Sequence, residues 1–160
     1  PADNTLNGGV VRTFDPLAET LARSVLLRSL ILKDAEFVRR VEPGLFSTPL
    51  VVGVHQVRIV ASGSQDGLPT PEGIHRDAER YTFQHLIGRH LIKGGEFRAY
   101  DADKNLIFEW LQEEPFDSVV FLGTTWHSAA PISAILPAQK GYRDILLIDF
   151  EPATPRDGGV

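Results

Sequence analysis

Hydrophobic residues recur at roughly helical spacing in the first part of the chain. Leu17, Leu21 and Val25 can share one face of a helix, while the charged residues between them remain available for solvent. Just before them, Asp15-Pro16 is a typical helix start, in which a capping carboxylate precedes a proline in the first turn. The pattern therefore predicts an amphipathic helix over residues 16–33 and a second, short helix over residues 34–41.

From residue 49 onward, the pattern changes to short apolar or alternating runs separated by glycine, proline and acidic residues. Such runs are typical of antiparallel strands joined by turns. A doubly wound α/β fold would need helices between the strands, and the pattern predicts none after residue 41. The predicted strands cover residues 10–14, 50–62, 80–89, 96–101, 105–111, 118–123, 126–133 and 142–151.

About eight strands of this kind, preceded by helices, predict a mainly β fold. We expect a double-stranded β-helix, a cupin-like jelly roll, with one or two N-terminal α-helices packed on one sheet. A chain of 160 residues with 42% hydrophobic content is expected to form a single domain over residues 1–160. Its parts would be helical support (15–41), a jelly-roll catalytic core (49–151) and a flexible tail (152–160).

Composition narrows the function classes. The formal net charge of −5 gives no basic footprint for nucleic acid, so a small molecule is the expected partner. The absence of cysteine excludes disulfides, thiolate metal sites and a cysteine nucleophile. No apolar run approaches the ~18 residues that a membrane span needs, so we expect a soluble, cytoplasmic protein.

A histidine and a carboxylate form the first candidate site, in the segment GIHRD at residues 73–77. His75 and Asp77 are two residues apart, so in extended backbone both side chains project to the same side and can reach one metal ion. The preceding PTPEG segment at residues 69–73 is a rigid, turn-prone approach that can present the pair at the mouth of a barrel.

A third metal ligand has to come from another strand. His85 and His90 follow the pair too closely, unless the chain turns sharply, and His55 precedes it. His127 lies on a separate predicted strand and is followed by small residues that leave space. Two imidazoles and one carboxylate are the ligand set of non-haem iron(II) oxygenases, which leaves open positions for a cosubstrate and dioxygen. A histidine of the core or a sheet edge is the alternative reading of His127.

Arg143 is placed on the same face of its predicted strand as Ile145 and Leu147, which is expected to be apolar and inward. A buried guanidinium needs an anionic partner. That partner is either a protein carboxylate in a structural ion pair, or the distal carboxylate of a small dicarboxylic acid bound at an open metal site.

Taken together, these motifs resemble the iron(II)/2-oxoglutarate-dependent dioxygenases. The ordered run consists of GIHRD (73–77), LIGRH with GGE (86–96), His127 followed by Pro131-Ile132, and GYRD (141–144). It is most similar to the branch of bacterial free-L-amino-acid hydroxylases that includes isoleucine 4-hydroxylase and biofilm-associated relatives. The resemblance covers residues 50–151 and implies a double-stranded β-helix.

The resemblance also implies roles and cofactors. His75, Asp77 and His127 would be the catalytic iron(II) ligands, and Arg143 would hold the C5 carboxylate of 2-oxoglutarate, with dioxygen as the second cosubstrate. The implied reaction is hydroxylation of an aliphatic C–H bond, most simply of a free L-amino acid. Related halogenases lack the carboxylate ligand, so Asp77 favours hydroxylation. The alternatives are a peptide or protein hydroxylase and a non-catalytic cupin-like metal-binding module.

Four further residues are candidates for binding the substrate. Gln56 and Arg58 share one face of the strand 50–62, and they can bind a carboxylate and an amine if that face is interior. The same face is equally consistent with solvent. Tyr81 and Phe83 share a face of the next strand and can line the pocket, although alternating aromatic residues are usually core.

Overall fold

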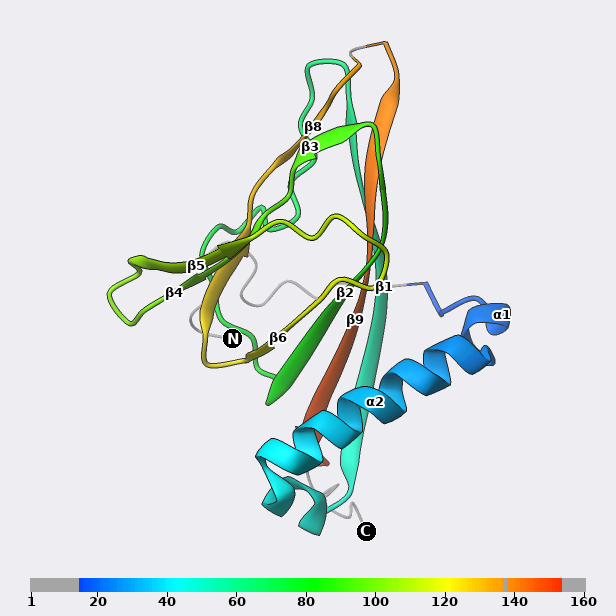
Figure 1. Cartoon of the computed structure of the whole chain (residues 1–160), viewed down its shortest axis with the longest axis vertical. Helices are drawn as coiled ribbons and strands as arrows, with labels where there is room; N and C mark the ends of the chain where they lie inside the picture. Colours follow the sequence, from blue (N-terminus) through cyan, green and yellow to red (C-terminus); the bar gives the residue numbers. More distant parts are fainter. Residues whose placement is uncertain (1–14, 137, 154–160) are drawn as a thin grey trace, which may run out of the picture.

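The computed structural model describes residues 15–136 and 138–153 (Figure 1). The predicted strand 10–14 and residues 154–160 of the predicted tail lie outside the described residues. The elements are α1 (Glu19–Ala22), α2 (Val25–Val41), the 3-10 helix η1 (Pro43–Ser47), β1 (Leu50–Ser62), β2 (Tyr81–His90), β3 (Ile92–Gly94), β4 (Phe97–Tyr100), β5 (Leu106–Trp110), β6 (Ser118–Leu122), β7 (Trp126–Ala129), β8 (Ile132–Ala134) and β9 (Lys140–Pro152).

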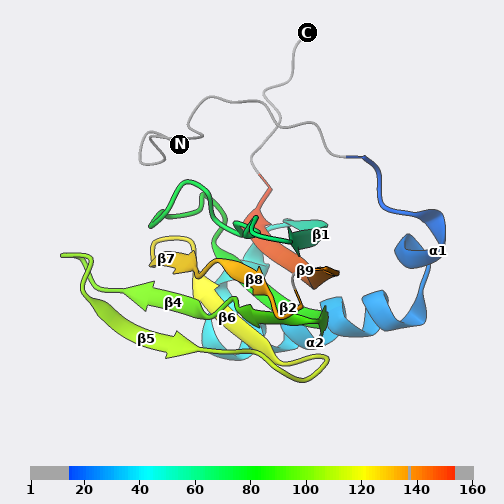
Figure 2. The ribbon, with the colours of Figure 1, turned by 90° about the horizontal axis from the view of Figure 1, so that it is seen from above.

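All strand pairs are antiparallel, and they form two layers, which confirms the predicted mainly β, jelly-roll fold. The larger sheet has the strand order β1-β9-β2-β6. The facing layer contains a three-stranded sheet, β5-β4-β7, and a two-stranded sheet, β3-β8. Figure 2 shows the two layers from above, with the β4–β5 hairpin and β7 facing β1 and β9.

The helices pack on the outer face of the larger sheet, as predicted, but their bounds differ from the prediction. One helix was expected over residues 16–33, and the structure instead breaks the helix at Arg23-Ser24. The side chain of Ser24 accepts a hydrogen bond from the Leu27 backbone N–H at 3.1 Å, so Ser24 caps a new helix. From there α2 runs without interruption to Val41. Val25, the first residue after the cap, is 81% exposed and not on the buried face.

Hydrophobic residues of α2 and the larger sheet share a core. Leu27 and Val38 belong to the same buried cluster as Phe83, Ile148 and Phe150. A polar contact joins the same two elements, because Asp34 Oδ2 lies 2.9 Å from His85 Nε2 and both residues are buried. This face of the sheet is therefore closed by the helix, and the opposite face is left to form the inside of the jelly roll.

The predicted strand 126–133 is two strands in the structure. β7 pairs with β4, whereas β8 pairs with the short strand β3, which was not predicted. The chain changes partner at Ala130-Pro131, where proline has no N–H to donate to a ladder. Gly94 on β3 has φ +81°, and a Cβ there would lie 2.3 Å from the Pro131 carbonyl oxygen, so this close crossing requires glycine.

Among the described residues, no helix is both long and apolar enough to cross a membrane.

Candidate functional site

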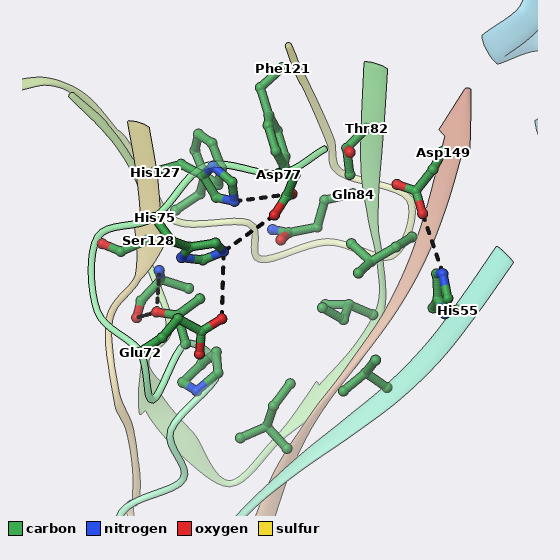
Figure 3. Close-up of a pocket in the computed structure, with 18 of the residues that line it drawn as sticks. His55, Glu72, His75, Asp77, Thr82, Gln84, Phe121, His127, Ser128 and Asp149 are labelled. Carbon is green, nitrogen blue, oxygen red and sulfur yellow. Dashed lines mark hydrogen bonds and ion pairs between the residues drawn. The ribbon is translucent and has the colours of Figure 1, made fainter. Parts of the chain in front are cut away.

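A cavity of about 300 Å³ lies between the two layers (Figure 3). Alternate residues of the larger sheet line it, because successive side chains of a strand point to opposite faces. The second layer and the segment 69–79 close the other side. The lining residues include His55, Val57 and Ile59 of β1, Thr82 and Gln84 of β2, His127 of β7, and Arg143, Ile145, Leu147 and Asp149 of β9.

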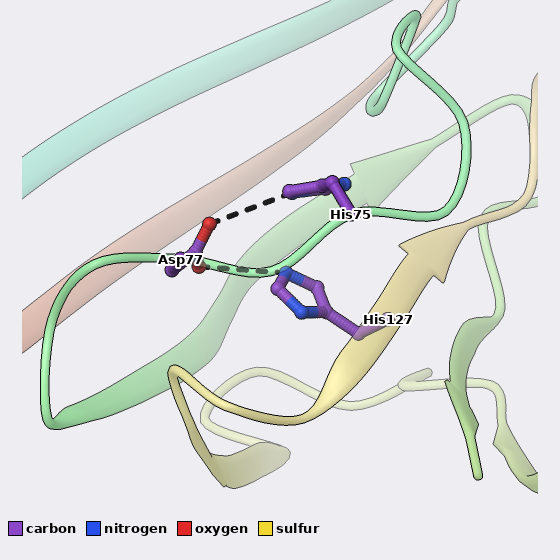
Figure 4. Close-up of side chains that lie close together, drawn as sticks. All are labelled: His75, Asp77 and His127. Atoms are coloured by element: carbon purple, nitrogen blue, oxygen red, sulfur yellow. Dashed lines mark ion pairs between the residues drawn. The ribbon is translucent and has the colours of Figure 1, made fainter. Parts of the chain in front are cut away.

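The two predicted histidine ligands are brought together by a backbone bridge (Figure 4). The His75 N–H donates to the His127 carbonyl at 3.0 Å, and the His127 N–H donates to the His75 carbonyl at 2.9 Å. The segment that carries His75 thus pairs with β7, and the two ring centroids lie 4.3 Å apart. Both side chains are buried.

Backbone carbonyls orient both imidazoles. Nδ1 of His75 lies 3.0 Å from the Gly73 carbonyl oxygen, and Nδ1 of His127 lies 3.0 Å from the Thr125 carbonyl oxygen. A carbonyl can only accept, so each Nδ1 carries a proton, and in the neutral ring Nε2 then presents its lone pair. This is the tautomer that a metal ligand needs, and such a second contact fixes the direction of the ring.

Asp77 completes the group. Its Oδ1 lies 3.5 Å from Nε2 of His75, and its Oδ2 lies 3.4 Å from Nε2 of His127. The Asp77 backbone N–H donates to the Gly123 carbonyl at 3.1 Å, which ties the ligand to the turn before β7. A Cβ on Gly123 would lie 2.0 Å from the Glu79 carbonyl oxygen, so only glycine allows this approach.

Burial sets the charge states of these groups. Desolvation, followed by the neighbouring His75, lowers the pKa of His127 to about 4, so its imidazole is neutral near pH 7. Desolvation also raises the pKa of Asp77, against the opposing effect of His75. A bound cation would reverse this penalty for the carboxylate.

The donor set fits a divalent iron site. Ligand atoms of His75, Asp77 and His127 all lie within 4.8 Å of one another, close enough to share one ion. The donors are two imidazole nitrogens and one carboxylate, and all three residues border the cavity. A three-ligand set with an open side suits a metal that also binds a cosubstrate, whereas a structural site is closed by four protein ligands.

Arg143 lies in the same cavity and is 0% exposed. Its Nη2 donates to Gln112 Oε1 at 2.8 Å, whereas its Nε and Nη1 have no hydrogen-bond partner among the described residues. Burial, followed by the nearby positive charge of Arg89, lowers the pKa of Arg143 to about 10. The sequence left two possible partners for Arg143, a protein carboxylate or the carboxylate of a bound dicarboxylic acid. No carboxylate of the described residues forms a salt bridge with it. Two buried, unpaired donors can instead bind an anion that enters the cavity.

Gln112 holds this guanidinium in place, and sequence reasoning missed it. Its side chain is fully buried, and Oε1 accepts from Gln84 Nε2 at 2.7 Å as well as from Arg143. Its Nε2 donates to the backbone carbonyls of Gln84 at 3.0 Å and Asp117 at 2.6 Å. No pattern in the sequence distinguishes this glutamine from a surface residue, because its partners Gln84 and Arg143 lie on strands that are distant in the sequence.

The prediction that Gln56 and Arg58 line the pocket is wrong. Both are exposed on the outer face of β1, and the cavity is lined by the alternate residues of that strand. Arg58 forms a two-point ion pair with Asp144, with Nε–Oδ1 and Nη2–Oδ2 distances of 2.7 and 2.6 Å, and stacks over Tyr142.

Tyr81 and Phe83 do not line the pocket either, so this prediction is also wrong. Both side chains are buried in the cluster that packs against α2. Their strand turns Thr82 and Gln84 toward the cavity instead. Both aromatic residues belong to the hydrophobic core, which was the alternative prediction for them.

The other histidines lie apart from the candidate metal ligands. His85 faces the helix, where Nε2 contacts Asp34 and Nδ1 lies 2.6 Å from Ser118 Oγ. His90 is exposed and packs beside the Tyr142 ring. His55 lines the cavity near Asp149. Asp149 is a further cavity residue that sequence reasoning did not single out.

The geometry agrees with a comparison of the sequence with known families. Residues 2–149 match the family model described as 2OG-Fe dioxygenase. The chain belongs to this family. The family is named for 2-oxoglutarate and iron, the dicarboxylate and the ion that the buried arginine and the candidate metal ligands fit.

Two curated relatives are similar along almost the whole chain. L-isoleucine-4-hydroxylase of Bacillus thuringiensis is 26% identical over 145 residues, which are 90% of this chain and 60% of that protein. The 3(1)-hydroxy-L-isoleucine 4-dioxygenase of Pantoea ananatis (strain AJ13355) is 26% identical over 151 residues, with coverages of 94% and 61%. The chain thus spans about three fifths of the length of these relatives.

Solved structures share the fold. The crystal structure of IDO from Bacillus thuringiensis has a TM-score of 0.82 at 24% identity, and the match covers 91% of this chain and 64% of that one. A bsmA homolog from Methylobium petroleophilum PM1 has a TM-score of 0.77 at 24% identity, with coverages of 89% and 56%. The Fe(II)/(alpha)ketoglutarate-dependent dioxygenase TqaL has a TM-score of 0.75 at 16% identity, with coverages of 92% and 61%.

Proposed function

We propose that this protein uses Fe(II), 2-oxoglutarate and O2 to hydroxylate an aliphatic C–H bond of a small molecule, most simply a free L-amino acid. One observation carries the proposal. A fully buried arginine with two unpaired donors lies in the same cavity as two histidines and a carboxylate that can share one ion. A dicarboxylate that chelates the metal and extends to Arg143 would satisfy both features.

In this proposal, Nε2 of His75, Nε2 of His127 and a carboxylate oxygen of Asp77 hold the iron. The Gly73 and Thr125 carbonyls keep both imidazoles in the tautomer that leaves Nε2 free. Arg143 binds the C5 carboxylate of 2-oxoglutarate through its unpaired donors. Bound iron and 2-oxoglutarate supply the oxidising chemistry, in which decarboxylation to succinate is coupled to insertion of one oxygen atom of O2 into the C–H bond.

The other residues of the cavity would position the substrate and exclude water from the metal site. The rings of Phe97 and Phe121 lie 6.1 and 4.4 Å from the His127 ring, centroid to centroid, and cover this ligand. Ile145 and Leu147 form an apolar wall along β9, between Arg143 and the far end of the cavity. A substrate held against this wall would keep one C–H bond near the metal. This positioning would raise the rate of the reaction.

The small cavity and the relatives support a free amino acid as substrate. A volume of about 300 Å³ is at the lower end of small-molecule sites. Both curated relatives are named for isoleucine or hydroxyisoleucine. Because this chain spans only part of their length, the activity and substrate of the whole protein are part of the proposal.

The test is succinate release from 2-oxoglutarate with Fe(II), ascorbate and each of the twenty L-amino acids. We expect at least one amino acid to stimulate release, and His75→Ala or Asp77→Ala to abolish it. His90→Ala is the matched control, because His90 is exposed and away from the cavity, and it should behave as wild type.

Three results would redirect the proposal. Normal turnover in the His75 or Asp77 variants would reject the metal site. Stimulation by peptides and not by amino acids would indicate a peptide or protein hydroxylase. A protein that binds metal but never releases succinate would be a non-catalytic cupin-like module.

A further inference from the structure

The cavity has a second charged end, opposite Arg143. Asp149 lies on the same face of β9 as Arg143, Ile145 and Leu147, and its side chain borders the cavity although the residue is only 7% exposed. Asp149 lies six positions after Arg143, which is ~20 Å along a strand at ~3.3 Å per residue. A five-carbon dicarboxylate that reaches both the iron and Arg143 spans less than half of this distance. Asp149 is therefore available for a different molecule.

The surroundings of Asp149 leave its negative charge incompletely compensated. His55 Nε2 lies 3.5 Å from Asp149 Oδ2, which is longer than a charge-assisted hydrogen bond. Desolvation, together with the carboxylates of Glu79 and Asp77, raises the pKa of Asp149 to about 6, against the effects of Thr82 and His55. The fold therefore holds a carboxylate in a place that disfavours its charge.

The cavity reaches this carboxylate, because Asp149 and His55 are both among its lining residues. β1 has a glycine, Gly53, opposite Asp149, and a Cβ at that position would lie only 3.3 Å from Asp149 Oδ2. Figure 3 shows Asp149 and His55 across the cavity from His75 and Glu72. Between these two sides lies the apolar wall that includes Leu147. A negative group beside an aliphatic wall is complementary to a molecule with a cationic head and an apolar body.

We propose that Asp149 binds the ammonium group of the substrate, so that the aliphatic part lies along Leu147 and Val57 and is directed toward the metal ligands. The inference rests on the proposed oxygenase function and adds to it a residue that would select the ammonium group of an amino-acid substrate. An ammonium group is a compact cation with three donors, and in a desolvated site it forms a strong bond with a carboxylate. The bound cation would place a positive charge directly against this carboxylate.

The test compares two probes that differ only in the ammonium group. L-isoleucine and 3-methylpentanoate, which lacks the amine, are titrated by anaerobic calorimetry into the protein loaded with Fe(II) and 2-oxoglutarate. Wild type should prefer L-isoleucine by at least about tenfold, as expected for a charge-assisted contact. Asp149→Asn should lose most of this preference. Asp144→Asn should keep it, because Asp144 is an acid of the same strand that pairs with Arg58 on the other face.

The outcomes separate the inference from the proposed function. Equal binding of the two probes by wild type, or an unchanged preference in Asp149→Asn, overturns the ammonium site and leaves 2-oxoglutarate turnover untouched. Failure of wild type to bind any of the twenty amino acids also overturns it. Failure to bind 2-oxoglutarate in the presence of Fe(II) would instead reject the oxygenase function. Melting temperatures of both variants show whether the fold is kept.

Discussion

Replacing Arg143 by methionine should stabilise the metal-free protein and remove most of its affinity for 2-oxoglutarate. The reason is the burial of a charge that the described fold leaves without a counter-ion. Lowering the pKa of Arg143 from its ordinary value to about 10 corresponds to about 3 kcal/mol of unfavourable free energy for the charged form. At pH 7 the guanidinium is charged in both the folded and unfolded states, so this cost is fully present in the wild-type protein.

Methionine avoids the cost without creating a new one. It has a similar length and fills an irregular apolar space. Oε1 of Gln112 loses one donor but keeps Gln84 Nε2 at 2.7 Å, so no acceptor is left unpaired. Replacing a buried charge by an apolar residue of similar volume typically stabilises by about 1–4 kcal/mol. We expect a gain of about 1–3 kcal/mol, or roughly 2–12 °C in melting temperature.

The assay combines urea unfolding with calorimetric titration of 2-oxoglutarate. The variant should be more stable than wild type without ligand, and it should bind 2-oxoglutarate with at least about 30-fold lower affinity, since loss of a desolvated charge pair is worth about 2–5 kcal/mol. Arg98→Met is the control, because it removes an exposed ion pair with Glu109 and should change stability by less than about 1 kcal/mol. A destabilised Arg143 variant, or one with unchanged 2-oxoglutarate affinity, would refute the reasoning.

Three further substitutions test the surrounding network. Gln112→Leu should lower 2-oxoglutarate affinity about tenfold and reduce the free energy of unfolding by about 1–3 kcal/mol, because Arg143 loses its buried hydrogen-bond partner. Asp149→Asn should raise the free energy of unfolding at pH 7 by up to about 3 kcal/mol, since the pKa of this carboxyl is raised from 3.8 to about 6 in the fold. His85→Leu should cost about 3–5 kcal/mol, because it leaves Asp34 buried without its partner.

The sign of the pH effect at Asp149 follows from the direction of its pKa change. The folded state binds the proton more tightly than the unfolded state, so wild type loses stability as pH rises from about 3.8 to about 6. The gain in Asp149→Asn should be complete above pH 6 and absent below pH 3.8. Urea unfolding at pH 7 and at pH 4 measures this, and an equal difference at both values would contradict it. For Gln112→Leu and His85→Leu, a urea midpoint equal to that of wild type would contradict the prediction.

The sequence predicted the larger sheet well, because three of its four strands have ten or more residues. β1 was expected over residues 50–62, and the structure has the same bounds, between Pro49 and Gly63. His75 and Asp77 were expected to project to the same side, and they lie around one point with His127. Their role as iron ligands stays a prediction.

The sequence could not show which face of each strand borders the cavity. Period-two alternation places Gln56 with Arg58, and Tyr81 with Phe83, but both faces of the larger sheet carry buried residues. One face packs on α2 and the other borders the cavity, so hydrophobic and polar residues occur on both. Because α2 packs on the face that carries Tyr81 and Phe83, Thr82 on the opposite face points into the cavity. The same limit concealed Gln112, which bonds to Gln84 and Arg143 on other strands, and Asp149, which lies beside His55 of β1.

The central claim is that one cavity joins a metal to an anion anchor, and the affinity for 2-oxoglutarate with and without Fe(II) tests it most directly. Anaerobic calorimetric titration should show that Fe(II) strengthens 2-oxoglutarate binding at least about tenfold in wild type. Because the chelating end of the ligand needs the metal, His127→Ala should lose this enhancement. An affinity that is the same with and without Fe(II) would contradict the account.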